Sequence, residues 1–389
     1  MNSFITSIGT ANPPNKFEQL KIADFMANAS TLSVKDKVKL QTLYRASGIR
    51  YRYSVIPDFG LSEAEYRFFP AGKDPDQMPG TKARMKYYSQ CALPLALQAV
   101  NNCLDKSDKN KAINITHLIT VSCTGMYAPG LDLELVQAMG LPGSTQRTCI
   151  NFMGCYAAFN ALKTADSICQ SDPEATVLVV CLELCTLHYQ NSTHWDQILS
   201  NALFGDGAAA CLVERNPTSG ANLQLKGFYC DIEPKGKEDM AWQIADSGFD
   251  MILSSYVPNL IGDGIEKLAC RLNEKLADTV DKVDYYAIHP GGKKILEVIE
   301  DKLKMSKYDN RFSYEVLQQY GNMSSATVLF VLEKIMQTLQ SEDHKKNILS
   351  FAFGPGLTLE SMMLQVSYTS TFVGQEVSYQ DQILMNHHV

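Results

Sequence analysis

The chain has 389 residues, of which 45% are hydrophobic and 20% are charged, and its formal net charge is -7 at pH 7. This composition is typical of a globular protein and excludes a largely disordered or fibrous chain, while the length exceeds that of one ordinary domain. The acidic balance disfavours nucleic acid and anionic membranes as partners, so we expect small-molecule or protein partners.

Eleven cysteines are spread through apolar runs, without the paired spacings of a small disulfide scaffold. We therefore expect free thiols in a reducing compartment. Residues 1–9 lack the basic start and sustained apolar run of a secretion signal, and no run of about eighteen apolar residues occurs further on. These features predict a cytoplasmic protein without a membrane segment.

Two helices are predicted between residues 17 and 45, because apolar residues recur there at three and four positions. This segment ends in a basic group formed by Arg45, Arg50 and Arg52. A solvated face is the preferred interpretation of these charges. Basic side chains at the mouth of a tunnel, suited to a phosphate-bearing carrier, are the alternative.

A strand–helix–strand unit follows, with strand-like apolar runs at residues 113–123 and 176–181. The helix between them is predicted to begin at Cys155, and the backbone N–H groups of a helix N-terminus stabilise an anion. We therefore expect a thiol pKa below the usual value of about 8.5, as a nucleophile requires. The alternative is that Cys155 is a small buried core residue.

The second half of the chain repeats this order of elements. Strand-like runs at residues 283–289 and 348–353 flank a helix predicted from Met323 to about Gln340. Corresponding motifs in the two halves are separated by about 166 to 170 positions, which indicates an internal duplication. We place the boundary between the halves in residues 216–222.

The duplication places Asn322 at the helix start that corresponds to Cys155 in the first half, and it places His289 at a strand end. Strand ends beside helix starts are where α/β proteins hold reacting groups. We therefore expect residues 1–220 to supply the cysteine, and residues 221–389 to supply the histidine and the asparagine, to one central site.

These three side chains suit acyl transfer from a thioester. A thiolate accepts the acyl group, and an imidazole stabilises the thiolate and donates a hydrogen bond to a developing oxyanion. The carboxamide of Asn322 is an uncharged donor that can hold an enolate without losing a proton. A lone histidine is more often structural than catalytic, but the matching halves favour a catalytic His289.

A metal site is a competing interpretation, because Cys181, Cys185 and His188 have a CxxxCxxH spacing. No second Cys or His pair nearby completes four ligands, and Cys181 continues a valine-rich strand. We therefore prefer a role in lining a pocket over zinc binding.

Five strings resemble, in the right order, the signatures of the chalcone-synthase-like, or type III, polyketide synthases. They are Gly154-Cys155, ALFGDGAA at 202–209, IHPGG at 288–292, GNMSSAT at 321–327 and FGPGLT at 353–358. The resemblance covers nearly the whole chain. It implies an α/β, thiolase-like fold with five αβαβα layers from two duplicated halves. It also implies a homodimer that acts on acyl-CoA starters and malonyl-CoA, with no metal and no other cofactor.

The resemblance also implies roles for individual residues. Cys155 is the acyl acceptor, while His289 and Asn322 polarise the malonyl thioester, so that loss of carbon dioxide leaves a stabilised enolate. This enolate attacks the Cys155 thioester. Phe204 matches a gatekeeping aromatic that desolvates the malonyl carboxylate, and an ordinary core residue is the alternative interpretation.

Other positions resemble the bacterial members of the family, which often accept aliphatic starters and make alkylpyrones or alkylresorcinols. Met251, a flexible apolar side chain, stands where the plant enzymes have a second gatekeeping phenylalanine. Further positions of the family's pocket are held by Cys123, His188, Ser324 and Trp242, and by Gly354 and Pro355 in a turn that shapes the cyclisation wall.

The carrier site departs from the plant pattern. Two of its three basic residues appear here as Thr42 and Ala46, which leaves Lys39, with Arg45 as a substitute. Recognition of coenzyme A is therefore expected to differ, and an acyl carrier protein is an alternative donor of the starter.

Three other functions compete with iterative condensation. A single-condensation ketoacyl synthase or hydroxymethylglutaryl-CoA synthase would share the fold, but Asn322 in its GNMSS setting and the GPG turn favour the iterative branch. A cysteine hydrolase of the papain kind would use water and need no malonyl-CoA, and the duplicated halves do not suit it. A non-catalytic acyl-binding protein is the third alternative, but it would give Cys155, His289 and Asn322 no chemical role.

Overall fold

The computed structural model describes residues 2–72, 74, 77–107, 114–276 and 282–369. Its strands are β1 (Phe4–Ala11), β2 (Asn15–Glu18), β3 (Tyr51–Ser54), β4 (His117–Ser122), β5 (Gln146–Asn151), β6 (Thr176–Leu184), β7 (Asp206–Glu214), β8 (Gly220–Ile232), β9 (Met240–Ala245), β10 (Gly248–Leu253), β11 (Tyr285–Ile288), β12 (Asn347–Gly354) and β13 (Thr358–Thr369). Its α-helices are α1 (Gln19–Ala29), α2 (Val34–Ala46), α3 (Thr81–Leu104), α4 (Leu131–Met139), α5 (Ala157–Ser171), α6 (Trp195–Leu203), α7 (Val257–Lys275), α8 (Lys293–Leu303), α9 (Arg311–Tyr320) and α10 (Thr327–Thr338). Ile113, predicted to begin a strand, and residues 370–389, assigned to the second half, lie outside the described residues.

The main sheet has nine strands in the order β11-β12-β13-β8-β1-β7-β6-β4-β5. Strands of the two halves meet along β1 and β8, where Phe4 pairs with Gln224 and Ile5 pairs with Leu223. Each half contains a parallel pair with a central helix between its strands in the chain: β4 and β6 with α5, and β11 and β12 with α10. The predicted repeat of strand, helix and strand is therefore present in both halves.

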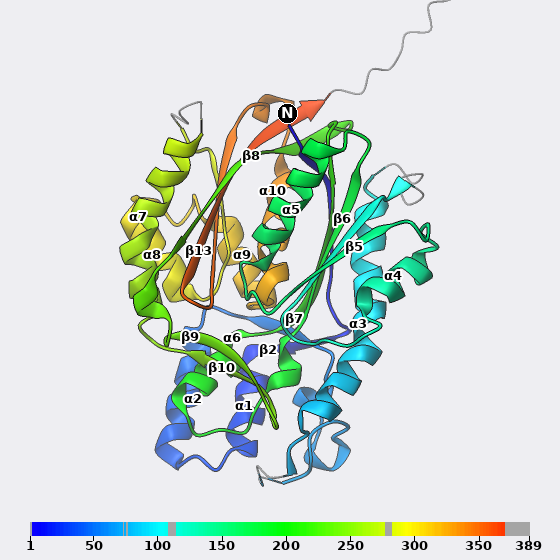
Figure 1. Cartoon of the computed structure of the whole chain (residues 1–389). Helices are drawn as coiled ribbons and strands as arrows, with labels where there is room; N and C mark the ends of the chain where they lie inside the picture. Colours follow the sequence, from blue (N-terminus) through cyan, green and yellow to red (C-terminus); the bar gives the residue numbers. More distant parts are fainter. Residues whose placement is uncertain (1, 73, 75–76, 108–113, 277–281, 370–389) are drawn as a thin grey trace, which may run out of the picture.

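Five layers result from this sheet and its helices (Figure 1). Helix α3, with α4 beside it, covers the outer face of the N-terminal strands, and α7 and α8 cover the outer face of the C-terminal strands. Helices α5 and α10 lie between the two sets of strands. The thiolase-like αβαβα fold is therefore confirmed, and its two sets of strands are continuous through β1 and β8.

The side-chain pattern of the buried strands explains these layers. On β6, which is buried along its whole length, Val179 packs with the central helices and Val180 packs toward α3. On β12, Ala352 faces the central helices and Phe351 faces α7 and α8. Because both faces of β6 and β12 are apolar, these strands appear in the sequence as continuous apolar runs.

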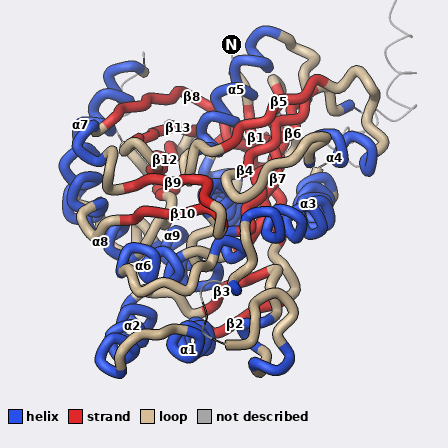
Figure 2. Tube along the Cα trace, turned by 60° about the horizontal axis from the view of Figure 1, so that its bottom comes forward, coloured by secondary structure: helices blue, strands red, loops and turns tan. Residues whose placement is uncertain are grey.

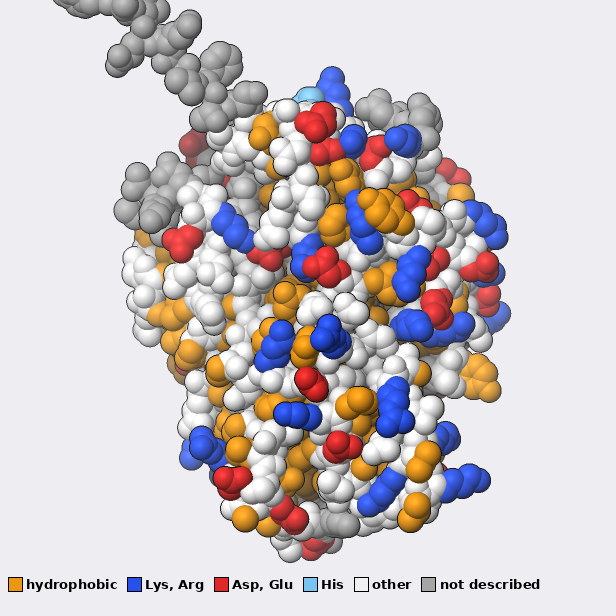
Figure 3. Space-filling view, turned by 180° about the vertical axis from the view of Figure 1, so that it is seen from behind, with side chains coloured by type: hydrophobic (Ala, Val, Ile, Leu, Met, Phe, Trp, Pro, Cys, Tyr) orange, Lys and Arg blue, Asp and Glu red, His pale blue; other side chains and the backbone are white. Residues whose placement is uncertain are grey.

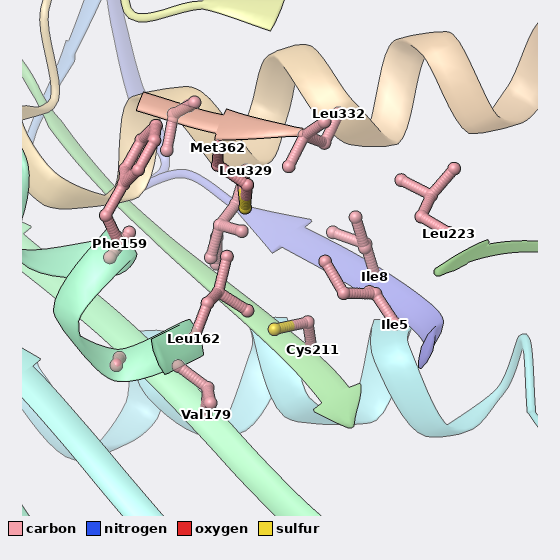
Figure 4. Close-up of a cluster of buried hydrophobic side chains, with 14 of the residues drawn as sticks. Ile5, Ile8, Phe159, Leu162, Val179, Cys211, Leu223, Leu329, Leu332 and Met362 are labelled. Atoms are coloured by element: carbon pink, nitrogen blue, oxygen red, sulfur yellow. The ribbon is translucent and has the colours of Figure 1, made fainter. Parts of the chain in front are cut away.

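The central layer holds the two halves together. Its core contains Phe159 and Leu162 of α5 and Leu329 and Leu332 of α10, packed with Ile5, Ile8, Val179, Cys211, Leu223 and Met362 of the strands (Figure 4). Each fully buried aliphatic side chain of this kind stabilises the fold by about 1.5–3 kcal/mol. Since α5 and α10 come from different halves, this core fixes the loops at their N-terminal ends relative to each other.

Both central helices begin later than the sequence predicts. Helix α5 begins two residues after Cys155, and α10 begins at Thr327 after a 3₁₀ turn. In the second loop, Ser324 has a left-handed backbone with φ of 46°, and the Met323 N–H donates a hydrogen bond to the Thr327 hydroxyl at 2.8 Å. This local bond closes the turn and delays the α-helix, so Asn322 lies in the loop before it.

Helices α1, α2 and α6 and the two-stranded hairpin β9–β10 form a base at one end of the layers (Figures 1 and 2). A second hairpin, β2 with β3, belongs to the same end. Helices α1 and α2 correspond to the two helices predicted between residues 17 and 45. The hairpins were not predicted, because their strands are short and β9 is only half-buried.

The surface carries charges of both signs. On the face drawn in Figure 3, acidic and basic side chains are intermixed with apolar ones. This face therefore presents no field of a single sign, which nucleic-acid binding would require. Within the described part of the chain, no helix combines the length and the apolarity needed to cross a bilayer.

Gly9 in β1 lies against the backbone of α3, and this contact is testable. A Cβ atom at Gly9 would lie 2.1 Å from the Cys103 nitrogen and 2.5 Å from the Ala99 carbonyl oxygen. Because helix backbone cannot move aside as a flexible side chain can, we expect Gly9→Ala to lower the free energy of unfolding by about 3 kcal/mol. Gly143→Ala is the matched control, because a Cβ atom there meets nothing within 4 Å. Equal urea midpoints for the two variants would contradict this packing.

Candidate active site

The turn that carries the thiol joins β5 to α5. Gly154 has a left-handed backbone with φ of 86°, and a Cβ atom there would lie 2.3 Å from Cδ of Pro355. Gly354 is equally confined, because its Cβ would lie 2.5 Å from the Tyr156 ring. These two glycines let the turn at Gly354 and Pro355 lie directly against Cys155.

Asn322 faces the thiol. The Sγ of Cys155 lies 3.9 Å from both the Oδ1 and the Nδ2 of Asn322. The carboxamide is oriented by its Oδ1, which accepts hydrogen bonds from the Ser324 N–H at 2.8 Å and the Thr327 hydroxyl at 3.4 Å. Its Nδ2 donates to the Gly291 carbonyl at 3.3 Å. The amide N–H₂ group therefore lies beside the sulfur, where it can donate a hydrogen bond to a bound ligand.

His289 follows β11, and its imidazole is buried, with 1% of the residue exposed. Its backbone is fixed, because its N–H donates to the Phe351 carbonyl at 2.8 Å. Among the described residues, neither ring nitrogen has a hydrogen-bond partner. Buried polar groups are nearly always paired, so an unpaired imidazole in the wall of a cavity is available to a ligand.

One cavity brings these three side chains together, and Phe204 lies in the same wall. The other predicted residues in its wall are Cys123, Met251, Ser324, Trp242 and Pro355, and further apolar wall residues are Met240, Ala241, Leu253, Ile295 and Phe353. Most of this wall is apolar. A carbonyl oxygen that enters the cavity therefore finds few donors besides the imidazole and the Asn322 amide.

Phe204 is tied to the asparagine through the backbone. The Asn322 N–H donates to the Leu203 carbonyl, and the Gly205 N–H donates to the Asn322 carbonyl, each at 2.9 Å. Arg52 fixes the same segment, because its guanidinium donates to the Phe204 carbonyl at 2.6 Å. Since Arg52 is only 2% exposed, its interpretation as part of a solvated face is wrong. Its charge is buried because it holds backbone carbonyls beside the site.

A buried carboxyl group that was not predicted joins the two halves next to the thiol. Glu183 accepts hydrogen bonds from the Cys123 N–H at 3.0 Å, from the Thr124 hydroxyl at 2.9 Å and from the Ser325 hydroxyl. Burial raises the pKa of Glu183 to about 7. This group holds the end of β4 against the loop that contains Asn322. A glutamate inside a strand-like apolar run was the signal that could have identified it.

The β9–β10 hairpin closes one side of the cavity. The Trp242 indole donates to the Cys123 carbonyl at 2.8 Å. The Nδ1 of His188 accepts from the Phe249 N–H at 3.1 Å, so its Nε2–H donates to the Thr124 carbonyl at 2.6 Å. Burial lowers the pKa of His188 to about 3. His188 lines the neighbouring cavity rather than the one around the thiol, and its two hydrogen bonds position the hairpin.

The residues of the CxxxCxxH spacing do not gather at one point. Cys181 packs in the central core, Cys185 lines the cavity, and His188 uses both ring nitrogens as described above. In the described ranges, no group of three or more His, Cys, Asp or Glu side chains has the arrangement of a metal site. The pocket-lining interpretation therefore suits Cys185, and Cys181 is a core residue.

The two residues predicted to bind the carrier lie outside these cavities. Lys39 and Arg45 are exposed on α2 and line none of the cavities at the site. The Lys39 ammonium lies 3.6 Å from the centroid of the Trp195 ring. Lys293 and Lys294 line the cavity next to the catalytic one. They were not predicted, although they directly follow the Pro-Gly-Gly turn after His289.

Burial governs the protonation of the thiol and the imidazole. It raises the pKa of Cys155 to about 12, although hydrogen bonding with Ser324 and Asn322 lowers it, and it lowers the pKa of His289 to about 3. Both groups are therefore neutral near pH 7 in this structure. The expected thiol pKa below about 8.5 is wrong, because the thiol lies ahead of α5 and desolvation outweighs the helix N-terminus.

Alkylation of Cys155 by iodoacetamide tests this protonation state. Because only the thiolate reacts, we expect the rate constant to rise about tenfold per pH unit between about pH 7 and 9.5, without a plateau. The modified Cys155 peptide is followed by mass spectrometry, with Cys155→Ser as the control for reaction at other thiols. A plateau reached below about pH 8 would show instead that a thiolate–imidazolium pair forms.

Two family models match the chain. The model described as chalcone and stilbene synthases, N-terminal domain, matches residues 2–217. The model of the C-terminal domain of the same synthases matches residues 224–367. The two matches follow one another in the chain, and the gap between them lies at the predicted boundary between the halves.

Two similar proteins are polyketide synthases by name. The chain is 30% identical over 372 residues to "Probable polyketide synthase 1" of Dictyostelium discoideum. The aligned region is 94% of this chain but only 11% of that much longer protein. It is 28% identical over 366 residues to "Alpha-pyrone synthesis polyketide synthase-like Pks18" of Mycobacterium tuberculosis, over 93% of this chain and 91% of that protein.

Two solved structures share the fold over nearly the whole chain. The C-terminal type III polyketide synthase domain of Steely1, a type I/III hybrid from Dictyostelium, has a TM-score of 0.85 at 28% identity and covers 94% of this chain and 99% of that domain. PKS-I from the brown alga Ectocarpus siliculosus has a TM-score of 0.86 at 27% identity, with coverage of 94% and 98%.

Proposed function

Because the chain belongs to the chalcone and stilbene synthase family and is a type III polyketide synthase, we propose that it condenses malonyl-CoA repeatedly onto an aliphatic acyl starter. Cyclisation then gives a pyrone, resorcinol or phloroglucinol-type product. The observation that carries this proposal is the placement of Cys155, His289 and Asn322 around one largely apolar cavity.

Acyl loading takes place on Cys155. The thiol proton passes to His289, the sulfur attacks the thioester carbonyl of the starter, and the carrier leaves as a thiol after it takes a proton from the imidazolium. One thioester replaces another, so the step needs no oxidant and no further reactant. The apolar wall keeps water from the acyl group.

Decarboxylation depends on two donors in the wall of the cavity that contains the thiol. An N–H of the His289 ring and the Nδ2–H of Asn322 donate to the malonyl thioester oxygen, where negative charge develops as the bond to carbon dioxide breaks. The apolar ring of Phe204 favours loss of the charged carboxylate. The enolate carbon then attacks the acyl carbon on Cys155, the thiolate leaves, and the extended chain remains on the malonyl carrier.

The largely apolar wall of the cavity around the thiol favours an aliphatic starter. A neighbouring cavity adjoins the catalytic one through shared wall residues, which are Cys185, Phe204, Trp242 and Met251. Its wall continues with apolar Ile22, Met26 and Phe59 and with polar residues, among them Gln190, Gln197 and Asn201. A hydrocarbon chain that starts at the thiol can extend past Met251 into this second space. The similarity to a protein named for α-pyrone synthesis supports a pyrone as the product.

Assembly, compartment and domain boundaries are part of the proposal. We place the two halves at residues 1–220 and 221–389. β5 is an end strand of the sheet that pairs with β4 on one side and is exposed along most of its length, so a second copy of the chain would cover it in a homodimer.

All eleven cysteines are free thiols, which supports a cytoplasmic location. Acyl-CoA or an acyl carrier protein delivers the starter.

Substitution of the three catalytic residues tests the mechanism. We expect Cys155→Ala to abolish acyl loading but to retain part of the malonyl-CoA decarboxylation, because enolate stabilisation does not need the sulfur. His289→Ala and Asn322→Ala should each lower decarboxylation and condensation by at least about 100-fold, since each removes a donor to the developing oxyanion. Acyl-enzyme mass, carbon dioxide release and product mass measure the three steps.

Cys270→Ala, which removes an exposed thiol of α7, is the control for these variants and should keep full activity. Polyketide formation at the normal rate by Cys155→Ala would contradict the assigned nucleophile. Products extended by one malonyl unit only would indicate a single-condensation enzyme. Release of free acid without malonyl-CoA would indicate a hydrolase.

Met251 tests the passage between the two cavities. We expect Met251→Phe to narrow this junction and to lower the use of lauroyl-CoA by about tenfold while hexanoyl-CoA is used normally, because overpacking excludes only the longer chain. Met251→Leu conserves the volume and is the control. Competition between the two starters, with products separated by mass, measures the preference. An equal loss for both starters would contradict the proposed route of the acyl chain.

A further inference from the structure

Arg84 lies in the first turn of α3 and is fully buried, with 0% of the residue exposed. Its guanidinium donates three hydrogen bonds, all to backbone carbonyls. Nε donates to Pro79 at 2.7 Å, and Nη1 donates to Tyr189 at 2.9 Å and to Leu187. Burial lowers the pKa of Arg84 to about 10, so the group stays charged at neutral pH. A buried cation that is stabilised by carbonyl groups fixes the backbone segments to which these carbonyls belong.

The segment at residues 187–190 is one of those that Arg84 fixes. The two carbonyls bound by Nη1 flank His188, which lines the neighbouring cavity in which we place the acyl chain. We call this space the acyl cavity. Tyr189 and Gln190 line it as well. Arg84 therefore holds the backbone of three consecutive wall residues, although its own side chain is not among the described residues of the wall.

The turn of the β9–β10 hairpin packs against the same guanidinium. A Cβ atom at Gly248 would lie 2.8 Å from the Nε of Arg84, and Gly248 has a φ of 132°, which favours glycine. Thr81, in the same turn of α3, donates from its N–H to the Asp246 carbonyl at 2.8 Å and from its hydroxyl to the Ala245 carbonyl. The start of α3 therefore fixes the position of the hairpin turn.

The two fixed segments are also joined to each other. The Phe249 N–H donates to Nδ1 of His188 at 3.1 Å, and the two rings are stacked with their centroids 4.1 Å apart. Met251, which belongs to the walls of both the acyl cavity and the catalytic one, follows two positions after Phe249. A displacement of the guanidinium would therefore move the residues that border the passage between the two cavities.

We propose that Arg84 is a positioning residue that sets the width of this passage and thereby determines which length of aliphatic starter the enzyme accepts. This inference rests on the proposed function, because it names a determinant of starter choice at the proposed site. The guanidinium acts through residues 187–190 and the hairpin turn rather than on the substrate. Lysine would not replace it, because one ammonium group lacks the fixed fork of donors that reaches three carbonyls.

The experiment compares Arg84→Met with the wild-type protein, using lauroyl-CoA and hexanoyl-CoA as starters. Replacement of a buried charge by an apolar side chain of similar length is often neutral for stability, so we expect the variant to fold. KM for lauroyl-CoA should rise about tenfold while kcat changes less than twofold, because the lost contacts hold the far part of the chain and not the reacting atoms. Both constants for hexanoyl-CoA should change less than twofold.

Gly248→Ala tests the same contact from the side of the hairpin, because its new Cβ meets the Nε of Arg84. It should change the starter preference in the same direction, and it decides the question if Arg84→Met does not fold. Arg84→Lys keeps the charge but loses part of the hydrogen bonding, so it should give an intermediate KM for lauroyl-CoA. Arg271→Met, which removes an exposed arginine of α7, is the matched control and should leave both starters unaffected.

Hydrogen exchange separates this inference from the proposed function, because it needs no turnover. In Arg84→Met, the backbone amides of residues 240–253 should exchange at least about tenfold faster than in the wild-type protein, while those of α10 keep their rates. If the wild-type protein forms no polyketide from any starter, the proposed function fails, and faster exchange confined to the hairpin still supports the positioning role.

Two results would overturn the inference. One is an unchanged exchange rate of the hairpin amides in both Arg84→Met and Gly248→Ala. The other is an equal loss of kcat/KM for lauroyl-CoA and hexanoyl-CoA, which would mean that Arg84 stabilises the fold without selecting the starter.

Discussion

A short backbone bridge between two segments far apart in the chain controls the geometry of the site. Asn322 pairs through both its N–H and its carbonyl with the residues on either side of Phe204, so the amide donor and the aromatic wall cannot move independently. Buried Arg52 and Glu183 reinforce this bridge from two sides. The arrangement of Cys155, His289 and Asn322 therefore follows from backbone pairing and the central core, and their side chains extend from it into the cavity.

The burial that assembles the site also makes its polar groups costly. Arg52 and Glu183 offset their desolvation with several hydrogen bonds, whereas the ring nitrogens of His289 have no partner among the described residues. An unsatisfied buried polar group costs about 1–3 kcal/mol. The extended apolar core of both halves offsets this cost, and a bound carbonyl oxygen would supply one of the missing bonds. The hydrogen bond that the His289 ring lacks in the free protein is thus formed with a thioester, and it contributes to the affinity for that ligand.

Local motifs explain why part of the site was predictable. Cys155 and Asn322 stand beside glycines that the turns require, and His289 ends an apolar strand, so each could be identified from a few neighbours. Arg52 was misjudged, because the hydrogen bond that fixes it goes to Phe204, which lies far away in the sequence. The hydrogen bonds of His188 to Phe249 and Thr124 could not be predicted for the same reason. Lys293 and Lys294 were missed because two adjacent lysines look alike in a sequence whether they face solvent or line a cavity.

The sequence by itself determined the repeated strand–helix–strand order of the two halves and singled out Cys155, His289 and Asn322, because apolar runs and glycine turns are properties of adjacent residues. Only the tertiary structure decided the protonation of Cys155 and His289, since desolvation depends on atoms from every layer around them. It likewise decided that Lys39 lies over the Trp195 ring while Lys293 and Lys294 line the cavity next to the one around the thiol. Helix packing sets where a long side chain can reach, and no local pattern encodes it.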